Sequence, residues 1–155
     1  MNRICLFPGT FDPVTLGHTD IINRALPLFD KLYIGIGRNA NKQPMFSEQQ
    51  RLNWINEIYQ GNDKVEAVVY DGLTVDCCEK IGANYILRGI RYVNDFEYEK
   101  GIADMNRSIA QNIETIFLTC LPQYTSVAST LVRDVLKYGG DVSQFLPDAV
   151  VRTIK

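Results

Sequence analysis

Histidine is almost absent from this 155-residue chain, because His18 is the only one. Cysteine is sparse and shows no CxxC pair; the four cysteines are Cys5, Cys77, Cys78 and Cys120. These shortages exclude a disulfide framework and a transition-metal site built from histidine and cysteine. Because most of the cysteines stand in apolar runs, we expect buried, reduced thiols of a cytosolic protein, with a redox or nucleophilic cysteine as the alternative.

Long hydrophobic runs are also missing. No stretch approaches the roughly 18 consecutive apolar residues that a membrane-spanning helix needs. The apolar stretch that precedes Pro8 is too short for a signal peptide. We therefore expect a cytoplasmic protein without a membrane partner.

Neither sign of charge is in large excess: 16 Lys and Arg stand against 18 Asp and Glu, a net charge of −2. A protein that holds duplex DNA through its phosphates needs a basic surface, so we expect no nucleic-acid partner. A small anionic ligand is compatible with this balance, because cations can cluster locally. The length and a hydrophobic content of 46% predict a single domain over residues 1–155.

Short apolar runs alternate with stretches of helical periodicity along the whole chain. The expected strands are 4–7, 32–36, 65–70, 84–88 and 113–118. The expected helices are 17–29, 47–59, 72–81, 98–109, 131–138 and a short one after Pro147. This alternation predicts an α/β fold: a single Rossmann-like, doubly wound, five-stranded parallel sheet with helices on both faces. In such a sheet, ligands bind beyond the carboxyl ends of the strands.

Individual residues predict where some helices begin and end. Pro27 should kink or shorten the last turn of the first helix. Ser47, with Gln50 three residues later, resembles a capping box. Gly82 should close the third helix.

The first strand end is rich in groups that suit a phosphate. Gly9 permits close approach of the backbone, Thr10 offers a hydroxyl and an N–H, and Gly17-His18 opens a helix. A helix N-terminus favours anions, and a histidine there can donate a hydrogen bond to a phosphate oxygen. The alternative is that the glycines only turn the chain and that His18 caps or packs.

Three cations follow other strand ends. Lys42 lies in the loop after the second strand, Arg88 closes the fourth strand, and Arg91 follows a flexible Gly89-Ile90 link. Together they could grip two phosphate-bearing substrates in one crevice. Each taken alone could equally be a solvated surface charge.

The fourth helix has two contrasting faces. Asp95, Glu99 and Asn106 form a polar face, and the opposite side carries an apolar stripe made of Tyr98, Ile102, Met105 and Ile109. A polar face of this kind is either solvated or part of a ligand site.

After the fifth strand, a run of hydroxyl-bearing residues leads into a helix; it comprises Tyr124, Thr125, Ser126, Val127, Ala128, Ser129 and Thr130. Hydroxyls and free N–H groups at a helix N-terminus make a second site for anions. Ordinary N-capping by Ser129 or Thr130 is the alternative and is compatible with that role.

Several motifs match one family in order and spacing. Gly9-Thr10-Phe11-Asp12-Pro13, followed by Thr15-Leu16-Gly17-His18, resembles the opening signature of the nucleotidylyltransferases with an (H/T)xGH motif. Further segments narrow the resemblance to the bacterial phosphopantetheine adenylyltransferase family: Lys42-Gln43-Pro44-Met45-Phe46, Arg88-Gly89-Ile90-Arg91, Asp95-Phe96-Glu97-Tyr98-Glu99, Met105-Asn106-Arg107, Gly140-Asp141-Val142 and Phe145-Leu146-Pro147.

The resemblance implies transfer of the adenylyl group of ATP to 4′-phosphopantetheine, which gives dephospho-CoA and pyrophosphate. It implies ATP, phosphopantetheine, dephospho-CoA and CoA as ligands, Mg²⁺ held mainly by the ATP phosphates, and a homohexamer. The alternatives are a related nucleotidylyltransferase with another phosphorylated acceptor, and an ATP- or CoA-binding regulator without activity.

The resemblance also implies roles for individual residues. The expected catalytic residues are Thr10, His18, Lys42 and Arg91. The expected ATP-binding residues are Thr10, Phe11, His18, Gly89, Ile90, Arg91, Glu99, Tyr124, Thr125, Ser126, Val127, Ala128, Ser129 and Thr130. The expected acceptor-binding residues are Thr10, Lys42, Thr74 and Arg88. The chain departs from the family pattern at Tyr124 (usually Trp), Ala128 (usually Ser) and Asp134 (usually Glu), and the lost hydroxyl at position 128 puts a side-chain contact there in doubt.

Overall fold

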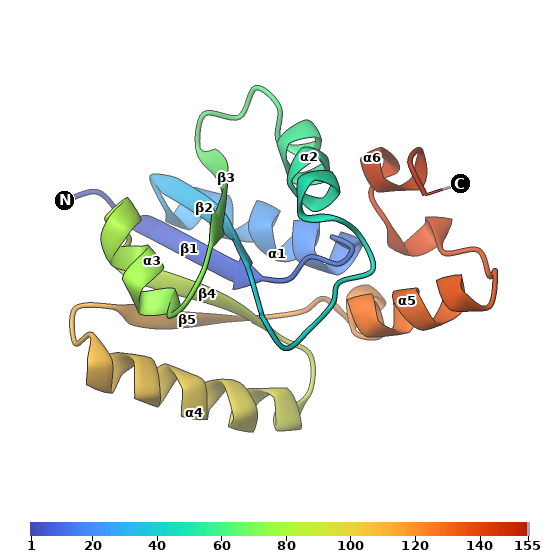
Figure 1. The fold of residues 1–155 in the computed structure, drawn as a ribbon. Coiled ribbons are helices and arrows are strands. Elements are labelled where there is room, and N and C mark those ends of the chain that lie inside the picture. The colour runs from blue at the N-terminus through green and yellow to red at the C-terminus, as the bar shows by residue number, and fades with distance from the viewer. Residues whose placement is uncertain (155) are drawn as a thin grey trace.

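The computed structural model describes residues 1–154, and its centre is one parallel sheet of five strands (Figure 1). The strand order is β3–β2–β1–β4–β5. The bounds are Ile4–Gly9 for β1, Lys31–Gly37 for β2, Val65–Tyr70 for β3, Tyr85–Ile90 for β4 and Glu114–Thr119 for β5. Strands β2 and β3 are added outward on one side of β1, and β4 and β5 are added on its other side, so the strand order reverses between β1 and β4. This switch point is where such an architecture forms its ligand crevice.

Helices cover both faces of the sheet, as the alternating pattern predicted (Figure 1). One core joins the sheet to α1 (Leu16–Ala25), α2 (Glu48–Ile58), α5 (Ser129–Lys137) and α6 (Asp148–Val151). A second core joins the opposite face to α3 (Thr74–Ile81), and α4 (Val93–Ile109) runs beside it. Strand β1 is buried on both faces, because Cys5 and Phe7 belong to the first core while Leu6 belongs to the second. The expected doubly wound fold is confirmed.

Three local signals in the sequence have the expected effect. Helix α1 ends at Ala25, and Pro27 stands in the 3₁₀ turn η1 (Leu26–Leu28) that follows. The Ser47 hydroxyl caps α2 by accepting the Gln50 N–H at 3.2 Å, which is the first of the two hydrogen bonds of the predicted capping box; the return bond between the Gln50 side chain and the Ser47 N–H is not formed. Gly82 ends α3 in the left-handed conformation, with φ of 71°.

The predicted end of the fourth strand is wrong. Strand β4 continues through Gly89 and Ile90, so Arg88 lies inside the strand and no flexible link precedes Arg91. The extension is paired, because Ile90 stands opposite Thr119 of β5. Pairing with a neighbouring strand is a tertiary effect that the two residues do not encode locally.

The sides of α4 differ from an ordinary amphipathic helix. The apolar stripe is exposed instead of packed on the core, and Tyr98 is 72% and Met105 is 63% exposed. It is not separated from the polar residues either, because Tyr98 and Ile102 line the same pocket as Glu99 and Asn106. Glu99, on the side expected to be polar and solvated, is only 8% exposed. The solvated interpretation of that face is therefore wrong for Glu99, because its carboxylate pairs with Arg88 of the sheet.

All four cysteines are free thiols, as expected. Cys5, Cys77 and Cys78 are buried and Cys120 is half-buried. Burial raises the pKa of Cys5, and it raises the pKa of Cys78 to about 12. These thiols stay neutral at physiological pH and do not suit nucleophilic catalysis. Within residues 1–154 the structure contains no helix with the length and hydropathy of a membrane span.

Candidate active site

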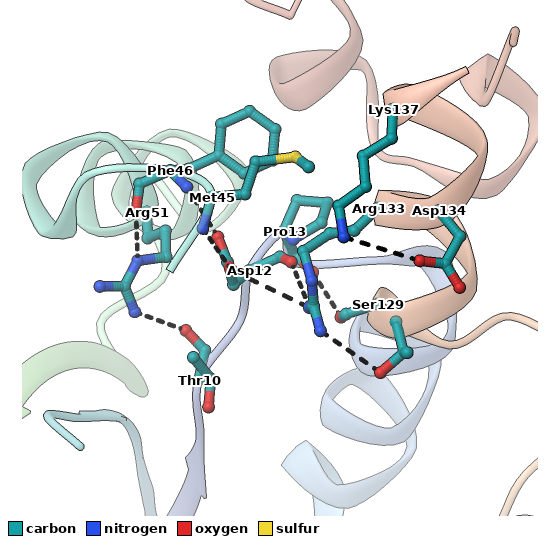
Figure 2. Close-up of polar contacts among 11 residues, drawn as sticks. Thr10, Asp12, Pro13, Met45, Phe46, Arg51, Ser129, Arg133, Asp134 and Lys137 are labelled. Carbon is teal, nitrogen blue, oxygen red and sulfur yellow. Dashed lines mark hydrogen bonds and ion pairs between the residues drawn. The ribbon is translucent and has the colours of Figure 1, made fainter. Parts of the chain in front are cut away.

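The loop that joins β1 to α1, residues 10–15, is held from several sides through its carbonyl groups (Figure 2). We call it the Thr10 loop. Arg51 of α2 donates to the Thr10 carbonyl at 2.8 Å, and Arg133 of α5 donates to the Asp12 carbonyl at 2.8 Å. Ser129, also in α5, donates to the Pro13 carbonyl at 2.8 Å. The loop is thus fixed by helices that are distant in sequence, which gives Thr10 a defined position.

His18 stands in the first turn of α1, and its ring is oriented by its own helix cap. The Thr15 backbone N–H donates to His18 Nδ1 at 3.0 Å, and the Thr15 hydroxyl lies 3.1 Å from the same nitrogen. Phe11 packs edge-on against the imidazole, with ring centroids 4.9 Å apart. Because Nδ1 accepts a hydrogen bond, a neutral His18 carries its proton on Nε2.

The surroundings of His18 favour the neutral form. Burial, and secondarily the positive charges of Arg88 and Arg91, lower the pKa of His18 to about 4. A neutral imidazole with Nε2–H is a hydrogen-bond donor without a net charge at pH 7. It can stabilise an oxyanion, and it is a poor general acid at that pH.

The three predicted cations are placed differently from one another. Arg88 of β4 donates to the Pro8 carbonyl at 2.6 Å and makes two hydrogen bonds to the Glu99 carboxylate, at 2.8 and 2.6 Å. Arg91 follows β4, and its Nε lies 3.5 Å from Asp95. Lys42 is exposed in the loop between β2 and α2. Arg88 is therefore fixed, whereas Lys42 depends on its loop for its position.

Two adjoining cavities open at the carboxyl ends of the strands. One, of about 510 Å³, we call the His18 cavity; among its lining residues are Thr10, Phe11, His18, Lys42, Arg88, Gly89, Arg91, Glu99, Val127, Ala128, Ser129 and Thr130. The other, of about 540 Å³, we call the Thr74 cavity; among its lining residues are Thr10, Tyr70, Thr74, Arg88, Ile102 and Asn106. Six residues line both cavities and form their common wall: Pro8, Gly9, Thr10, Arg88, Tyr98 and Glu99.

Most of the residues singled out in the sequence meet at these cavities. His18 and Lys42, 24 positions apart, line the same one. Of the expected acceptor-binding residues, Thr10, Thr74 and Arg88 line the Thr74 cavity, whereas Lys42 does not. Four predicted ATP-binding residues line neither cavity; they are Ile90, Tyr124, Thr125 and Ser126. Ile90 is buried in β4, and the other three precede the segment that reaches the His18 cavity.

The predicted capping of α5 by Ser129 or Thr130 is wrong. Ala128 occupies the N-cap position, and the cap has no side-chain hydrogen bond. Ser129 instead holds the Thr10 loop, and the Thr130 hydroxyl accepts from Arg133 at 3.3 Å. The first N–H groups of α5 are consequently not capped by a side chain, and the first two residues of the helix, Ser129 and Thr130, line the His18 cavity.

Asp12, Arg51 and Arg133 hold the site together, but sequence reasoning gave them no role. Asp12 and Arg51 are buried, at 3% and 4% exposed. Asp12 lies within the recognised motif, and its carboxylate could have been considered on that ground. Arg51 and Arg133 each lie on an otherwise ordinary helix, and only tertiary contacts reveal what they bind.

Comparison with known proteins agrees with this geometry. A family model described as cytidylyltransferase-like matches residues 6–135, so the chain is a protein of the cytidylyltransferase-like class. The solved structure of a proposed nicotinate-nucleotide adenylyltransferase from Vibrio parahaemolyticus superposes with a TM-score of 0.73, covering 99% of each chain. At 20% sequence identity, that likeness shows the fold alone.

Curated relatives define the family more narrowly. Phosphopantetheine adenylyltransferase of Flavobacterium psychrophilum is 49% identical over 148 residues, which cover 96% of this chain and 97% of the relative. The proteins of the same name from Bacteroides thetaiotaomicron and Lachnoclostridium phytofermentans are 47% and 40% identical, over 96% and 98% of this chain and 97% and 93% of their own. The chain belongs to the phosphopantetheine adenylyltransferase family.

Proposed function

We propose that this protein transfers the adenylyl group of ATP to the phosphate of 4′-phosphopantetheine, releasing pyrophosphate and forming dephospho-CoA. One observation carries the proposal beyond family membership: two cavities of similar size adjoin at a common wall that contains Thr10 and Arg88. This arrangement suits a reaction in which two phosphate-bearing substrates meet at one point.

The chemistry needs no enzymic base to generate the nucleophile. A phosphate monoester has a second pKa of about 6 and is mostly dianionic at pH 7. Its oxygen attacks the α-phosphorus of ATP, a new P–O bond forms, and the bond to the β-phosphate bridging oxygen breaks as pyrophosphate leaves. The protein must therefore overcome repulsion between two anions and stabilise the charge on the α-phosphate.

We assign that stabilisation to Thr10 and His18. The Nε2–H of neutral His18 donates to an α-phosphate oxygen, and its orientation is set by the Thr15 N–H on the other ring nitrogen. Because the donor is fixed before substrate binds, little reorganisation is needed in the transition state. His18→Ala should lower kcat by about 10²-fold.

The cations divide between the two substrates. Lys42 and Arg88 orient the attacking phosphate, while Arg91 and the start of α5 hold the β- and γ-phosphates. The uncapped N–H groups after Ala128 and the helix dipole support the second assignment. Thr74 and its neighbours then receive the pantetheine arm in the Thr74 cavity.

We propose Mg²⁺ as the cofactor, bound together with ATP. Within residues 1–154 the structure brings together no group of three or more acidic, histidine or cysteine side chains that could ligate a metal ion. A Mg²⁺ ion that enters with ATP would be held by phosphate oxygens and water. When bound, the ion would neutralise part of the charge on the triphosphate.

We further propose a cytoplasmic homohexamer. The support for self-association is the exposed apolar side of α4, where Met105 is 63% and Ile109 is 54% exposed. Ile109→Glu should convert the assembly to a smaller species in light scattering coupled to size exclusion. An unchanged mass would show that this side of α4 lies outside the interface.

The function is tested by mass spectrometry of the product. Purified protein with ATP, Mg²⁺ and phosphopantetheine should yield dephospho-CoA and an equal amount of pyrophosphate. Nicotinate mononucleotide and phosphocholine serve as competing acceptors and should yield far less product. Turnover of another acceptor would indicate a different transferase, and ATP binding without pyrophosphate would indicate a regulator.

A further inference from the structure

Two loops that carry proposed catalytic side chains are joined by a single buried carboxylate. The first is the Thr10 loop, and the second is the segment 38–46 between β2 and α2, which we call the Lys42 loop. Asp12 accepts the backbone N–H groups of Met45 and Phe46, at 2.8 and 2.9 Å, one on each carboxylate oxygen (Figure 2). With 3% of its surface exposed, Asp12 binds these N–H groups away from competing water.

Asp12 is itself held firmly, so it can act as a reference point. Its carbonyl accepts from Arg133 at 2.8 Å, and Arg133 Nη1 lies 3.9 Å from its carboxylate. Arg51 joins the same two loops a second time, since it donates to the carbonyls of Thr10 and Phe46 at 2.8 and 3.1 Å. The Lys42 loop is therefore anchored to the Thr10 loop and not only to its own strand and helix.

The Lys42 side chain has no comparable support. Within residues 1–154, no hydrogen bond or ion pair to the Lys42 ammonium is present. Its backbone N–H donates to the Asn39 carbonyl at 3.1 Å, and the Asp12 anchor lies three residues further on. The place of the ammonium is consequently determined by the backbone of its loop.

We propose that Asp12 is a positioning residue, which fixes the Lys42 loop relative to Thr10 and His18 and so holds the Lys42 ammonium where the attacking phosphate arrives. The inference rests on the proposed function, because it assigns Lys42 to that phosphate. A displacement of about 1 Å at a reacting group can cost on the order of 10²-fold in rate. Two hydrogen bonds to one rigid carboxylate are well suited to prevent it.

The test is a double-mutant cycle between Asp12→Asn and Lys42→Ala. An asparagine keeps the shape but presents an N–H₂ group to one of the two backbone donors, so one hydrogen bond is lost. Alone, Asp12→Asn should lower kcat/KM for phosphopantetheine by about 10²-fold. In the Lys42→Ala background, Asp12→Asn should lower kcat/KM by less than about threefold, because the Lys42 side chain through which Asp12 acts is gone.

Two further measurements separate positioning from general damage. The ATP dissociation constant of Asp12→Asn, measured by calorimetry, should stay within about threefold of the wild-type value. Amide hydrogen exchange at Met45 and Phe46 should accelerate while exchange in β1 is unchanged. Equal losses of kcat/KM in both backgrounds, or parallel weakening of ATP binding, would overturn the proposal.

A second variant covers the case in which Asp12→Asn fails to fold. Pro44→Gly leaves Asp12 intact and loosens the exposed backbone between the anchor and Lys42, so it should also raise the KM for phosphopantetheine, again only when Lys42 is present. Thr153→Val is the matched control, because it removes the 2.7 Å hydrogen bond to buried Trp54 on the same helix α2 and should leave kcat unchanged. If the wild-type protein forms dephospho-CoA but the double-mutant cycle shows no coupling between Asp12 and Lys42, only the role of Asp12 is refuted. If the wild-type protein forms no dephospho-CoA, the proposed function is refuted.

Discussion

A pH titration of His18 tests the central electrostatic feature of the site. Burial and two neighbouring arginines lower the pKa of this histidine to about 4, against an ordinary value of 6.5. At pH 7 the folded protein should therefore hold only about 0.1% of His18 in the charged form, compared with roughly a quarter for an unperturbed histidine. The Thr15 N–H on Nδ1 further requires the remaining proton to sit on Nε2.

The assay is direct because the chain has a single histidine. In untagged protein labelled with ¹⁵N-histidine, one pair of ring nitrogens is observed, so no assignment to a residue is needed and only Nδ1 and Nε2 must be told apart. We expect no titration between pH 8 and 5.5, a pyridine-type Nδ1 and a pyrrole-type Nε2. The same protein in urea should titrate near 6.5 and serves as the internal control.

The lowered pKa of His18 also makes the free energy of unfolding depend on pH. The folded state binds the proton less readily than the unfolded chain, so the contribution of neutral His18 is complete above pH 6.5 and is lost as the pH falls toward 4. At about 1.4 kcal/mol for each pKa unit, the contribution is on the order of 3 kcal/mol. A midpoint near 6.5 in the folded protein, or a proton on Nδ1, would refute the reasoning and the donor role of His18.

Four substitutions, one of them a comparison variant, extend the test to other parts of the molecule. Ala128→Ser supplies the missing cap of α5 and should raise the free energy of unfolding by about 1 kcal/mol, visible as a Tm increase of about 2–4 °C; no increase would mean that the cap N–H groups are satisfied otherwise. Gly35→Ala places a Cβ 2.8 Å from the Leu6 side chain and should lower the free energy of unfolding by about 1–3 kcal/mol, measured in denaturant. The Cβ of Gly61→Ala has no neighbour within 4 Å, so this variant tests the effect of the positive φ (79°) alone. Glu99→Gln should raise the KM for phosphopantetheine more than the KM for ATP, because Glu99 acts through Arg88; a larger effect on ATP would instead support the direct nucleotide contact that the family resemblance implies.

Local rules were sufficient for the scaffold. Strand β3 has the predicted bounds, and Pro27 and Gly82 end their helices as their backbone preferences require. These features depend on neighbouring residues in the chain, so the sequence displays them. The strand ends were less predictable, since the last pairs of β4 exist only because β5 lies alongside.

The faces of α4 show why residue type alone misassigned burial. A stripe of Tyr98, Ile102, Met105 and Ile109 normally packs on a core, and an acidic residue on the other side normally meets water. Here Glu99 is buried because Arg88, on the adjacent strand, requires a counter-charge beside the cavities. The Arg88–Glu99 ion pair thus accounts for the burial of an acidic residue on α4, and a pattern of hydrophobicity does not show which ion pair will form.

The same reasoning explains why the residues that build the site were harder to find than those that line it. Arg51, Arg88 and Arg133 each donate to a carbonyl of the segment 8–12, across sequence separations of 41, 80 and 121 residues. Each bond orders the chain and also brings a positive charge to the rim of the cavities that the phosphates are proposed to enter. A guanidinium can do both, because it has several N–H donors and keeps its positive charge when one of them is bound to a carbonyl. The sequence motif therefore marks the loop at which the substrates are proposed to bind, while arginines distant in the sequence hold that loop in place and supply the positive charge around it.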